Sequence, residues 1–183
     1  MIEIVELHQE LYKGKEFAVR YVTSGYYDIE PVKAGFQIQY KSFEEPIEKK
    51  FSDVFFGEWL DEPQAFGAFE NGQLLGYVEG ALEKWNNRYR ISNICVFDDL
   101  NRHAGIGTML MEVILKEAIK SSARMVILET QTCNEKAIAF YKKQGFQMIG
   151  FDLFSYSNTD MEEHEVRIEM GKLLGSANDP SRI

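Results

Sequence analysis

The clearest pattern of hydrophobic and polar positions begins shortly after residue 60. Apolar runs at residues 65–69 and 74–78 flank a polar turn that contains Asn71 and Gly72. An Asn-Gly pair between two apolar runs is a strong hairpin signal, because a type I′ turn needs positive φ at both central residues. We therefore predict two antiparallel strands here. Residues 2–7 alternate apolar and acidic side chains, which predicts an earlier, half-buried strand.

The second half of the chain alternates between strand and helix patterns. Apolar positions recur at helical spacing over residues 106–119, and a second helix is predicted over residues 134–143, ending before Gly145. A strand, a helix and a further strand in succession predict right-handed parallel pairing. The predicted strands of this half cover residues 89–97, 125–128, 146–156 and 165–173.

The segments without a clear period lie near the start of the chain. Residues 11–22 and 43–56 are mixed in polarity and rich in aromatic side chains, and we predict short helices there. We find no internal repeat and no linker, so one domain over residues 1–174 is expected, with one mixed α/β sheet and helices packed on both faces. The polar tail, residues 175–183, is expected to be frayed.

Composition narrows the classes of function. No run of 18 apolar residues occurs that could cross a bilayer or act as a signal segment, so a soluble, cytoplasmic protein without a membrane partner is expected. The cysteines, Cys95 and Cys133, form no metal-type motif, and we expect both to be reduced and no metal to be bound. The net charge of −9 argues against nucleic acid as a partner. It suits a cationic small substrate, although acidic surfaces also serve solubility alone.

The first motif with chemical content is an R-x-x-G-x-G stretch at residues 102–107, between a predicted strand and a predicted helix. Glycines let a backbone approach a ligand closely, and the amides of a first helical turn favour an anion such as a pyrophosphate. The stretch lacks the Gly-Lys-Ser/Thr ending of a triphosphate loop and the third glycine of a dinucleotide fold. By itself it is equally compatible with an ordinary helix start.

The second motif is N-x-x-A-x-x-F-Y-x-x-x-G-F, which covers residues 134–146. Asn134 suits the N-cap position of the predicted helix, and the spacing of Ala137, Ile138 and Tyr141 puts them on one helical face directed toward the sheet. Tyr141 is therefore expected to point inward, either as a core tyrosine or as a functional group.

In this order, the two motifs resemble the GNAT superfamily of acetyl-CoA-dependent N-acetyltransferases. The resemblance covers roughly residues 65–151. It implies a GNAT-type α/β fold with a mixed, mostly antiparallel sheet of roughly seven strands and helices on both faces. Further short matches are similar to the streptothricin acetyltransferases, which acetylate an amine in the β-lysine part of an antibiotic: residues 85–89, 94–96, 105–107, 128–131, 140–141 and 145–146.

The resemblance also implies roles for individual residues. The cofactor is acetyl-CoA, which leaves coenzyme A as the product. Tyr141 is the expected general acid that protonates the thiolate of coenzyme A. Backbone groups of a strand are expected to hold the pantetheine arm, the glycine loop the pyrophosphate, and Asn134 the cofactor arm. The cofactor-binding residues implied in this way are Ile94, Cys95, Val96, Arg102, His103, Ala104, Gly105, Ile106, Gly107, Thr108 and Asn134.

One departure from the streptothricin-type pattern concerns the substrate. Those relatives carry Glu-Asp where this chain has Ser92 and Asn93. An amine must be neutral to attack a thioester, so some group must accept its proton. Glu79, Glu83 and Glu129 are the candidates, and the choice among them stays open. The residues expected to line the acceptor site are Trp85, Tyr89, Ser92, Glu129 and the acidic loop at residues 160–165.

The reaction predicted from this reading is direct transfer of acetyl from acetyl-CoA to a primary amine of a small cationic compound, without a covalent enzyme intermediate. Streptothricin or a related aminated antibiotic is the first acceptor to consider, so antibiotic resistance is the expected role. Two alternatives stay open: an enzyme that acetylates a protein or peptide, and a non-catalytic acyl-CoA sensor. Either a monomer or a homodimer is compatible with the sequence.

Overall fold

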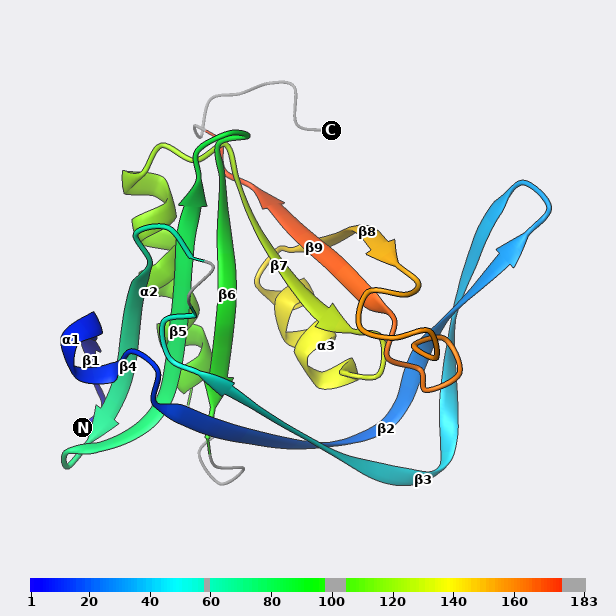
Figure 1. Cartoon of the computed structure of the whole chain (residues 1–183), viewed down its shortest axis with the longest axis horizontal. Coiled ribbons are helices and arrows are strands. Elements are labelled where there is room, and N and C mark those ends of the chain that lie inside the picture. Colours follow the sequence, from blue (N-terminus) through cyan, green and yellow to red (C-terminus); the bar gives the residue numbers. More distant parts are fainter. Residues whose placement is uncertain (58–59, 98–104, 176–183) are drawn as a thin grey trace. The chain divides into compact units, whose positions relative to one another are not determined.

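The computed structural model describes residues 1–57, 60–97 and 105–175 (Figure 1). Seven strands form one sheet in the order β1-β4-β5-β6-β7-β9-β8, and β2 and β3 form a separate two-stranded sheet. Among the helices within these ranges, none has the length and apolar character needed to cross a membrane. The elements are β1 (Glu3–Glu6), α1 (Gln9–Tyr12), β2 (Glu16–Val32), β3 (Gly35–Val54), β4 (Gln64–Glu70), β5 (Gln73–Glu83), β6 (Arg88–Val96), α2 (Ile106–Lys120), β7 (Met125–Gln131), α3 (Glu135–Lys143), β8 (Gln147–Asp152) and β9 (Arg167–Leu173).

The large sheet is mixed and mostly antiparallel, as predicted. The pairs β1–β4, β4–β5, β5–β6 and β8–β9 are antiparallel, whereas β6 and β7 are parallel. A parallel pair needs a long crossover, and α2 provides it. The predicted turn between β4 and β5 is confirmed, because Asn71 and Gly72 have φ values of 51° and 79°.

The described chain divides into two compact units. The first contains residues 1–19, 51–128 and the segment from Lys172, and the second contains residues 20–50 and 129–171. Both are built from separate stretches of sequence, so each depends on contacts between residues far apart in the chain. One domain over residues 1–174 stays a prediction.

In the first unit, α2 packs closely on the central strands. Ile106 and Leu110 of α2 are fully buried. A side-chain carbon at Gly76 of β5 would lie 3.1 Å from atoms of both residues and 2.9 Å from the carbonyl oxygen of Cys95. The glycine therefore lets the helix approach the sheet, which fixes the position of the first turn of α2 relative to β5 and β6.

The opposite face of β5 in this unit is covered by aromatic side chains. Successive residues of a strand point to opposite faces, so Tyr77 points away from the face on which α2 packs. Its ring centroid lies 5.7 Å from that of Phe17 and 4.5 Å from that of Phe55. These rings belong to a buried cluster of Leu7, Phe17, Val19, Phe55, Phe56, Ala65 and Tyr77.

The prediction of helices at residues 11–22 and 43–56 is wrong. Apart from Leu11 and Tyr12, which end α1, these segments lie mainly in β2 and β3, the long strands of the two-stranded sheet (Figure 1). The reason is a two-residue period that the mixed composition conceals: Phe17, Val19, Tyr21 and Thr23 are all buried, and the residues between them are exposed.

In the second unit, α3 follows β7 and directs Ile138 and Tyr141 inward, as predicted from its sequence spacing. β8 ends at Asp152, earlier than predicted, and an ordered loop follows it. Asp160 is buried in that loop and accepts hydrogen bonds from the backbone N–H of Tyr156 (2.8 Å) and the hydroxyl of Ser157 (2.7 Å). These bonds satisfy a carboxylate that would otherwise be costly to bury.

Candidate functional site

The strand that carries the predicted pantetheine-binding residues is β6. Its Ile94, Cys95 and Val96 pair with β5 and are partly buried. Cys95 is only partly buried, although it packs against the aromatic cluster. On the other side, the last pair of the parallel register joins Ile91 of β6 to Leu128 of β7. Residues 94–96 lie beyond that pair, and a strand extending past its last partner can add an extended ligand by backbone hydrogen bonds.

The predicted pyrophosphate loop leads into α2, whose N-cap is Gly105. This residue has φ 79° and ψ 2°, a left-handed conformation that favours glycine. No side chain of the described residues caps the helix, and the first turn holds no acidic residue. A carbon added at Gly105 would meet no atom of the described residues within 4 Å. The helix therefore presents the partial positive charge of its first turn without a competing carboxylate, which suits an anion.

The structure describes only some of the remaining loop residues. Ile106 is fully buried, whereas Gly107 and Thr108 are partly buried in the first turn of α2. Arg102, His103 and Ala104, which the resemblance assigns to the same function, lie outside the described residues. The observations that bear on pyrophosphate binding therefore come from Gly105 and the first turn of α2.

The second motif lies in the other unit, on α3. Asn134 is the N-cap of α3, and its side-chain oxygen accepts a hydrogen bond from the backbone N–H of Ala137 (3.4 Å). Tyr141 is 6% exposed, with its ring centroid 6.3 Å from that of Phe146 and 5.6 Å from that of Phe140. The sequence thus correctly predicted the cap and the inward direction of the phenol.

Two carboxylates meet β6 at Ser92 and Asn93, the positions where the streptothricin-type pattern has acidic residues. The hydroxyl of Ser92 donates to Glu79 of β5 (3.1 Å), and the side-chain amide of Asn93 donates to Asp53 at the end of β3 (3.0 Å). The acidic groups missing from β6 itself are therefore present on two neighbouring elements of the same unit.

Glu79 differs from the other candidate proton acceptors by its burial. Its side chain is fully buried, and it also accepts a hydrogen bond from the backbone N–H of Phe56 (2.7 Å). Burial raises the pKa of Glu79 to about 7, and the nearby charge of Asp53 acts in the same direction, while the bonds from Phe56 and Ser92 oppose the rise. A carboxyl group with such a pKa can exchange protons at neutral pH.

Glu83, four residues further along β5, is held by two arginines. Arg90 contacts it at 2.6 Å and Arg88 at 3.3 Å. Although burial of Glu83 opposes the effect, the hydrogen bond from Arg90 and further bonds and charges lower the pKa of its carboxyl. A carboxylate that stays ionised in an ion-paired cluster is a poor proton acceptor.

Glu129, the third candidate acceptor, lies in the second unit. Its carboxylate pairs with the guanidinium of Arg167 on β9 at 2.9 Å. This ion pair connects the end of β7 to β9, so the carboxylate of Glu129 is already engaged in holding two strands together. Among the three candidates, only Glu79 combines a buried carboxyl with neutral hydrogen-bond donors.

The two aromatic residues expected at the acceptor site have contrasting environments. Trp85 is 84% exposed in the turn between β5 and β6, with the guanidinium carbon of Arg88 6.0 Å from its ring centroid. Tyr89 is 1% exposed, and its hydroxyl donates to the side chain of Gln64 (2.9 Å) and lies 3.2 Å from the carbonyl oxygen of Gly80. The two residues therefore do not form one surface, and the hydroxyl of Tyr89 is already engaged by the protein.

The acidic loop at residues 160–165 makes polar and aromatic contacts with strands of the second unit. Glu165 forms an ion pair with Lys49 of β3 and accepts a hydrogen bond from Gln131 of β7 (3.1 Å). The ring of His164 stacks on that of Tyr26, with centroids 3.7 Å apart. Burial lowers the pKa of His164, so its ring is largely neutral at pH 7. The ion pair with Lys49 therefore offsets one negative charge of the loop, whereas the neutral ring of His164 offsets none.

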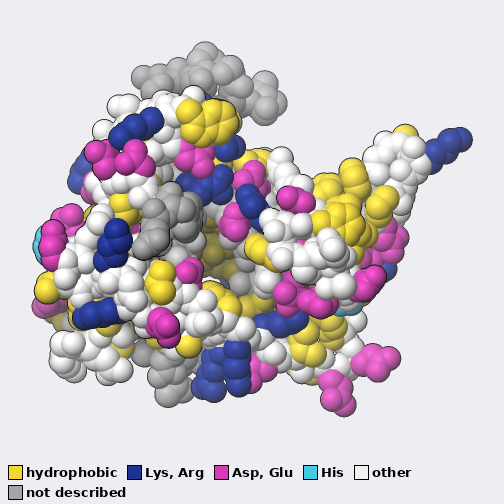
Figure 2. Space-filling view, viewed as in Figure 1, with side chains coloured by type: hydrophobic (Ala, Val, Ile, Leu, Met, Phe, Trp, Pro, Cys, Tyr) yellow, Lys and Arg dark blue, Asp and Glu magenta, His cyan; other side chains and the backbone are white. Residues whose placement is uncertain are grey.

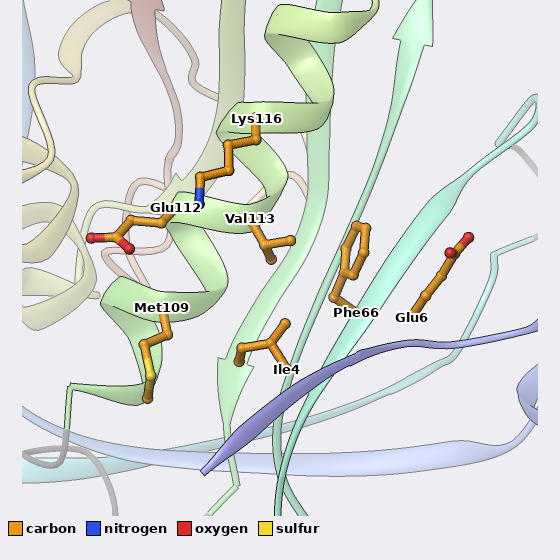
Figure 3. Close-up of a pocket in the computed structure, with 7 residues that line it drawn as sticks. All are labelled: Ile4, Glu6, Phe66, Met109, Glu112, Val113 and Lys116. Atoms are coloured by element: carbon orange, nitrogen blue, oxygen red, sulfur yellow. The ribbon is translucent and has the colours of Figure 1, made fainter.

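A shallow groove on the first unit contains none of the predicted site residues. It lies beside α2, where Val113 and Phe66 point toward one another while the carboxylate of Glu112 points away (Figure 3). The lining combines apolar contacts with charges of both signs, which is typical of a helix packed on the outer strands of a sheet. It consists of Ile4, Glu6, Phe66, Met109, Glu112, Val113 and Lys116.

Asp53 is the residue of this region that sequence reasoning missed. The segment around it was predicted to be a helix, which gave no reason to bring it near β6. In the structure, β3 ends at Val54, and the next residues pack under β5 through Phe55 and Phe56. No local signal could have identified this pairing, because residues 53 and 93 are far apart in sequence.

The family follows from a comparison of the whole sequence. The model of the Acetyltransferase (GNAT) family matches residues 32–146. The chain belongs to the GNAT acetyltransferase family. The GNAT chain is 30% identical to a streptothricin acetyltransferase of Escherichia coli over 154 residues, which cover 84% of this chain and 85% of that protein. The resemblance inferred from the motifs is thereby confirmed.

Solved structures support the same fold. A nourseothricin acetyltransferase superimposes with a TM-score of 0.77 at 22% identity, covering 95% of this chain and 99% of the other. A Bacillus anthracis protein assigned as a streptothricin acetyltransferase, solved with acetyl coenzyme A, gives a TM-score of 0.73 at 22% identity, covering 96% and 98%. The GNAT chain is an acetyl-CoA-dependent acetyltransferase that acts on an amine.

Proposed function

We propose that this enzyme transfers acetyl from acetyl-CoA to a primary amine of a small cationic compound, and that streptothricin or a related aminated antibiotic is its acceptor. The observation that supports this most is the pair of carboxylates, Glu79 and Asp53, bonded to Ser92 and Asn93. Negative groups at a strand that leads directly into Ile94 attract a protonated amine.

The charge of the whole molecule favours the same class of acceptor. The net charge is −9. On the face shown in Figure 2, lysine and arginine side chains lie scattered among acidic ones and form no continuous stripe over the residues drawn in colour. Such a surface raises the local concentration of a cation more than that of an anion. The similarity to the streptothricin acetyltransferase of Escherichia coli points to an aminated antibiotic within that class.

For the cofactor, we assign the roles that the sequence predicted. The backbone of Ile94, Cys95 and Val96 binds the pantetheine arm, residues 102–108 bind the pyrophosphate, and Asn134 contacts the cofactor arm. The first turn of α2, which no side chain of the described residues caps, supports the second assignment. For Asn134, the bond to Ala137 uses one lone pair of its side-chain oxygen, and its amide N–H groups can still donate to a ligand.

Bound acetyl-CoA supplies an activated acetyl group, and the amine attacks it directly. A backbone N–H of β6 stabilises the negative charge that develops on the carbonyl oxygen, because a fixed donor needs no reorganisation. The phenol of Tyr141 donates a proton to the departing thiolate. The inward direction of Tyr141 on α3 supports this assignment. No side chain needs to become covalently acetylated.

The proposal is tested by following release of free coenzyme A thiol with streptothricin, spermidine and a peptide with a free N-terminus. We expect fast turnover with streptothricin, slower turnover with spermidine and very little with the peptide. Turnover with the peptide alone would show a peptide acetyltransferase instead. Calorimetric binding of acetyl-CoA without turnover of any amine would show a non-catalytic sensor.

A further inference from the structure

The pairing of β5 with β6 is irregular at Ser92. Glu79 is paired with Asn93, and the next residue of β5, Gly80, is paired with Ile91, so Ser92 is the extra residue of a bulge. The last parallel pair between β6 and β7 also falls at Ile91. A bulge that coincides with the end of a strand pair redirects a side chain and is frequent next to active sites.

The glycine at this position makes the bulge possible. A side-chain carbon at Gly80 would lie 2.6 Å from the carbonyl oxygen of Arg90 and 2.6 Å from the ring of Tyr89, which no real side chain tolerates. The strands can therefore approach here only because residue 80 is glycine. As a result, the hydroxyl of Ser92 reaches the carboxylate of Glu79 across the strand pair (3.1 Å) while Ser92 stays partly exposed.

Among the described residues, Ser92 links the buried carboxylate of Glu79 to a partly exposed position on β6. Its side chain is fully buried, with one oxygen accepting from the backbone N–H of Phe56 and the other from Ser92. The titratable groups around it are the carboxylate of Asp53 on β3 and the phenols of Tyr77 and Tyr89. No lysine or arginine among the described residues is bonded to it, in contrast to Glu83.

We propose that Glu79 is the terminal acceptor of the proton that the substrate amine must lose, and that the hydroxyl of Ser92 relays it. A proton of the bound ammonium group passes to the oxygen of Ser92 as the hydroxyl proton of Ser92 passes to Glu79. The amine becomes neutral, Ser92 is unchanged and Glu79 is protonated. Glu79 returns the proton to solvent by the same path after turnover. This inference rests on the proposed function, since it requires an amine substrate.

The relay accounts for features that a purely structural carboxylate does not require. Holding the backbone N–H groups of Phe56, which has a left-handed φ of 57°, and of Gly57 requires acceptor oxygens but no carboxyl group that titrates near neutral pH. A pKa of about 7 suits a group that must be ionised before turnover and protonated during it. Ser92, which the sequence suggested as a substrate contact, then has a defined role between the amine and the buried carboxyl group.

The test is the pH dependence of kcat for Glu79→Gln, measured with the fastest acceptor of the thiol-release panel. Glutamine keeps an oxygen for the N–H of Phe56 but cannot take up the proton. We expect kcat at pH 7 to fall by roughly 100-fold, the usual contribution of a general base. Because the neutral fraction of an amine rises about tenfold per pH unit below its pKa, the loss should shrink to under about tenfold at pH 9.5.

Glu83→Gln is the matched control, because it makes the same change on the same strand. We expect its kcat to stay within about threefold of the wild type at every pH, since Glu83 is held by arginines outside the relay. A loss in Glu79→Gln that is constant from pH 6 to pH 9.5 would contradict the relay and indicate a structural role. An equal, pH-dependent loss in Glu83→Gln would also contradict it.

Two changes at Ser92 test the relay itself. Ser92→Ala should lower kcat at pH 7 by about tenfold, and Ser92→Thr, which restores a hydroxyl, should recover most of the loss. Equal activities of the two variants would exclude the hydroxyl from the route. If the wild type turns over no amine, the proposed function fails. If it is active and Glu79→Gln is equally active at pH 7, only the proton route fails.

Discussion

Two glutamates of β5, one in the middle of its pairing with β6 and one at its end, have opposite electrostatic environments. Glu79 is buried among neutral donors, and its pKa is raised to about 7. Glu83 is held by Arg88 and Arg90, and its pKa is lowered. The difference shows that the chemistry of a carboxyl group is decided by its partners, since both residues lie on one strand, four positions apart.

If Glu79 accepts the proton of the amine, the reaction also needs a group that donates a proton to the departing thiolate. The largest effect on kcat is expected when this donor, Tyr141, is replaced. Tyr141→Phe should lower kcat by roughly 100-fold or more, because the phenyl ring cannot donate a proton. The dissociation constant for acetyl-CoA should change little, since the ring still packs beside Phe146.

Steady-state kinetics and calorimetry measure these two quantities for Tyr141→Phe. Tyr40→Phe is the control, because its hydroxyl bonds to Glu135 on the surface of the same unit. A Tyr141→Phe enzyme with the turnover of the wild type would exclude Tyr141 from the mechanism. A matching loss in Tyr40→Phe would point to a general effect on the second unit.

The contrast between the glutamates also predicts opposite effects of pH on stability. The pKa of Glu79 is raised from 4.5 to about 7, so the folded state binds more protons than the unfolded state in that window. Stability due to Glu79 is thus present at low pH and is lost as pH rises from about 4.5 to 7. Between pH 4.5 and pH 8, Glu79→Gln should gain about 3 kcal/mol of unfolding free energy relative to the wild type.

For Glu83 the sign is reversed. Its pKa is lowered in the folded state, so its contribution is present above the pKa of an unperturbed glutamate and is lost as pH falls through the lowered value. Glu83→Gln should therefore be less stable than the wild type at neutral pH, and this difference should disappear as pH falls. Urea unfolding at several pH values measures both slopes, and slopes of the same sign for the two variants would refute the contrast.

The smallest expected effect concerns the cofactor. Gly105→Val forces a β-branched residue into a left-handed conformation at the start of α2, which disturbs the amides proposed to bind the pyrophosphate. We expect acetyl-CoA to bind about tenfold more weakly, which corresponds to roughly 1.4 kcal/mol. Calorimetric titration measures the change.

Gly14→Val is the matched control for Gly105→Val. Gly14 also has a left-handed φ, 76°, and a carbon added there meets nothing within 4 Å, but it lies in the turn between α1 and β2. The control should lose a similar amount of stability and keep its affinity for acetyl-CoA. Undiminished affinity in Gly105→Val, or equal losses of affinity in the two variants, would separate Gly105 from the cofactor site.

Local sequence patterns predicted most of the large sheet. The hairpin at Asn71 and Gly72, the crossover through α2 and the cap of α3 at Asn134 all follow from short-range rules, because each depends on residues within one or two turns of one another. The two-stranded sheet was mistaken for helices, since aromatic and charged residues obscure the alternation in β2 and β3. A strand is stabilised by a partner distant in sequence, which a local window cannot detect.

What the sequence determined by itself is the family, the order of strands and helices from residue 64 onward, and the inward face of α3 that carries Tyr141. Only the tertiary structure distinguished Glu79 from Glu83 and Glu129 and brought Asp53 to Asn93. The physical reason is that periodicity and caps are properties of neighbouring residues. Burial and hydrogen bonding of a carboxyl group depend on all elements that surround it, and these set its pKa.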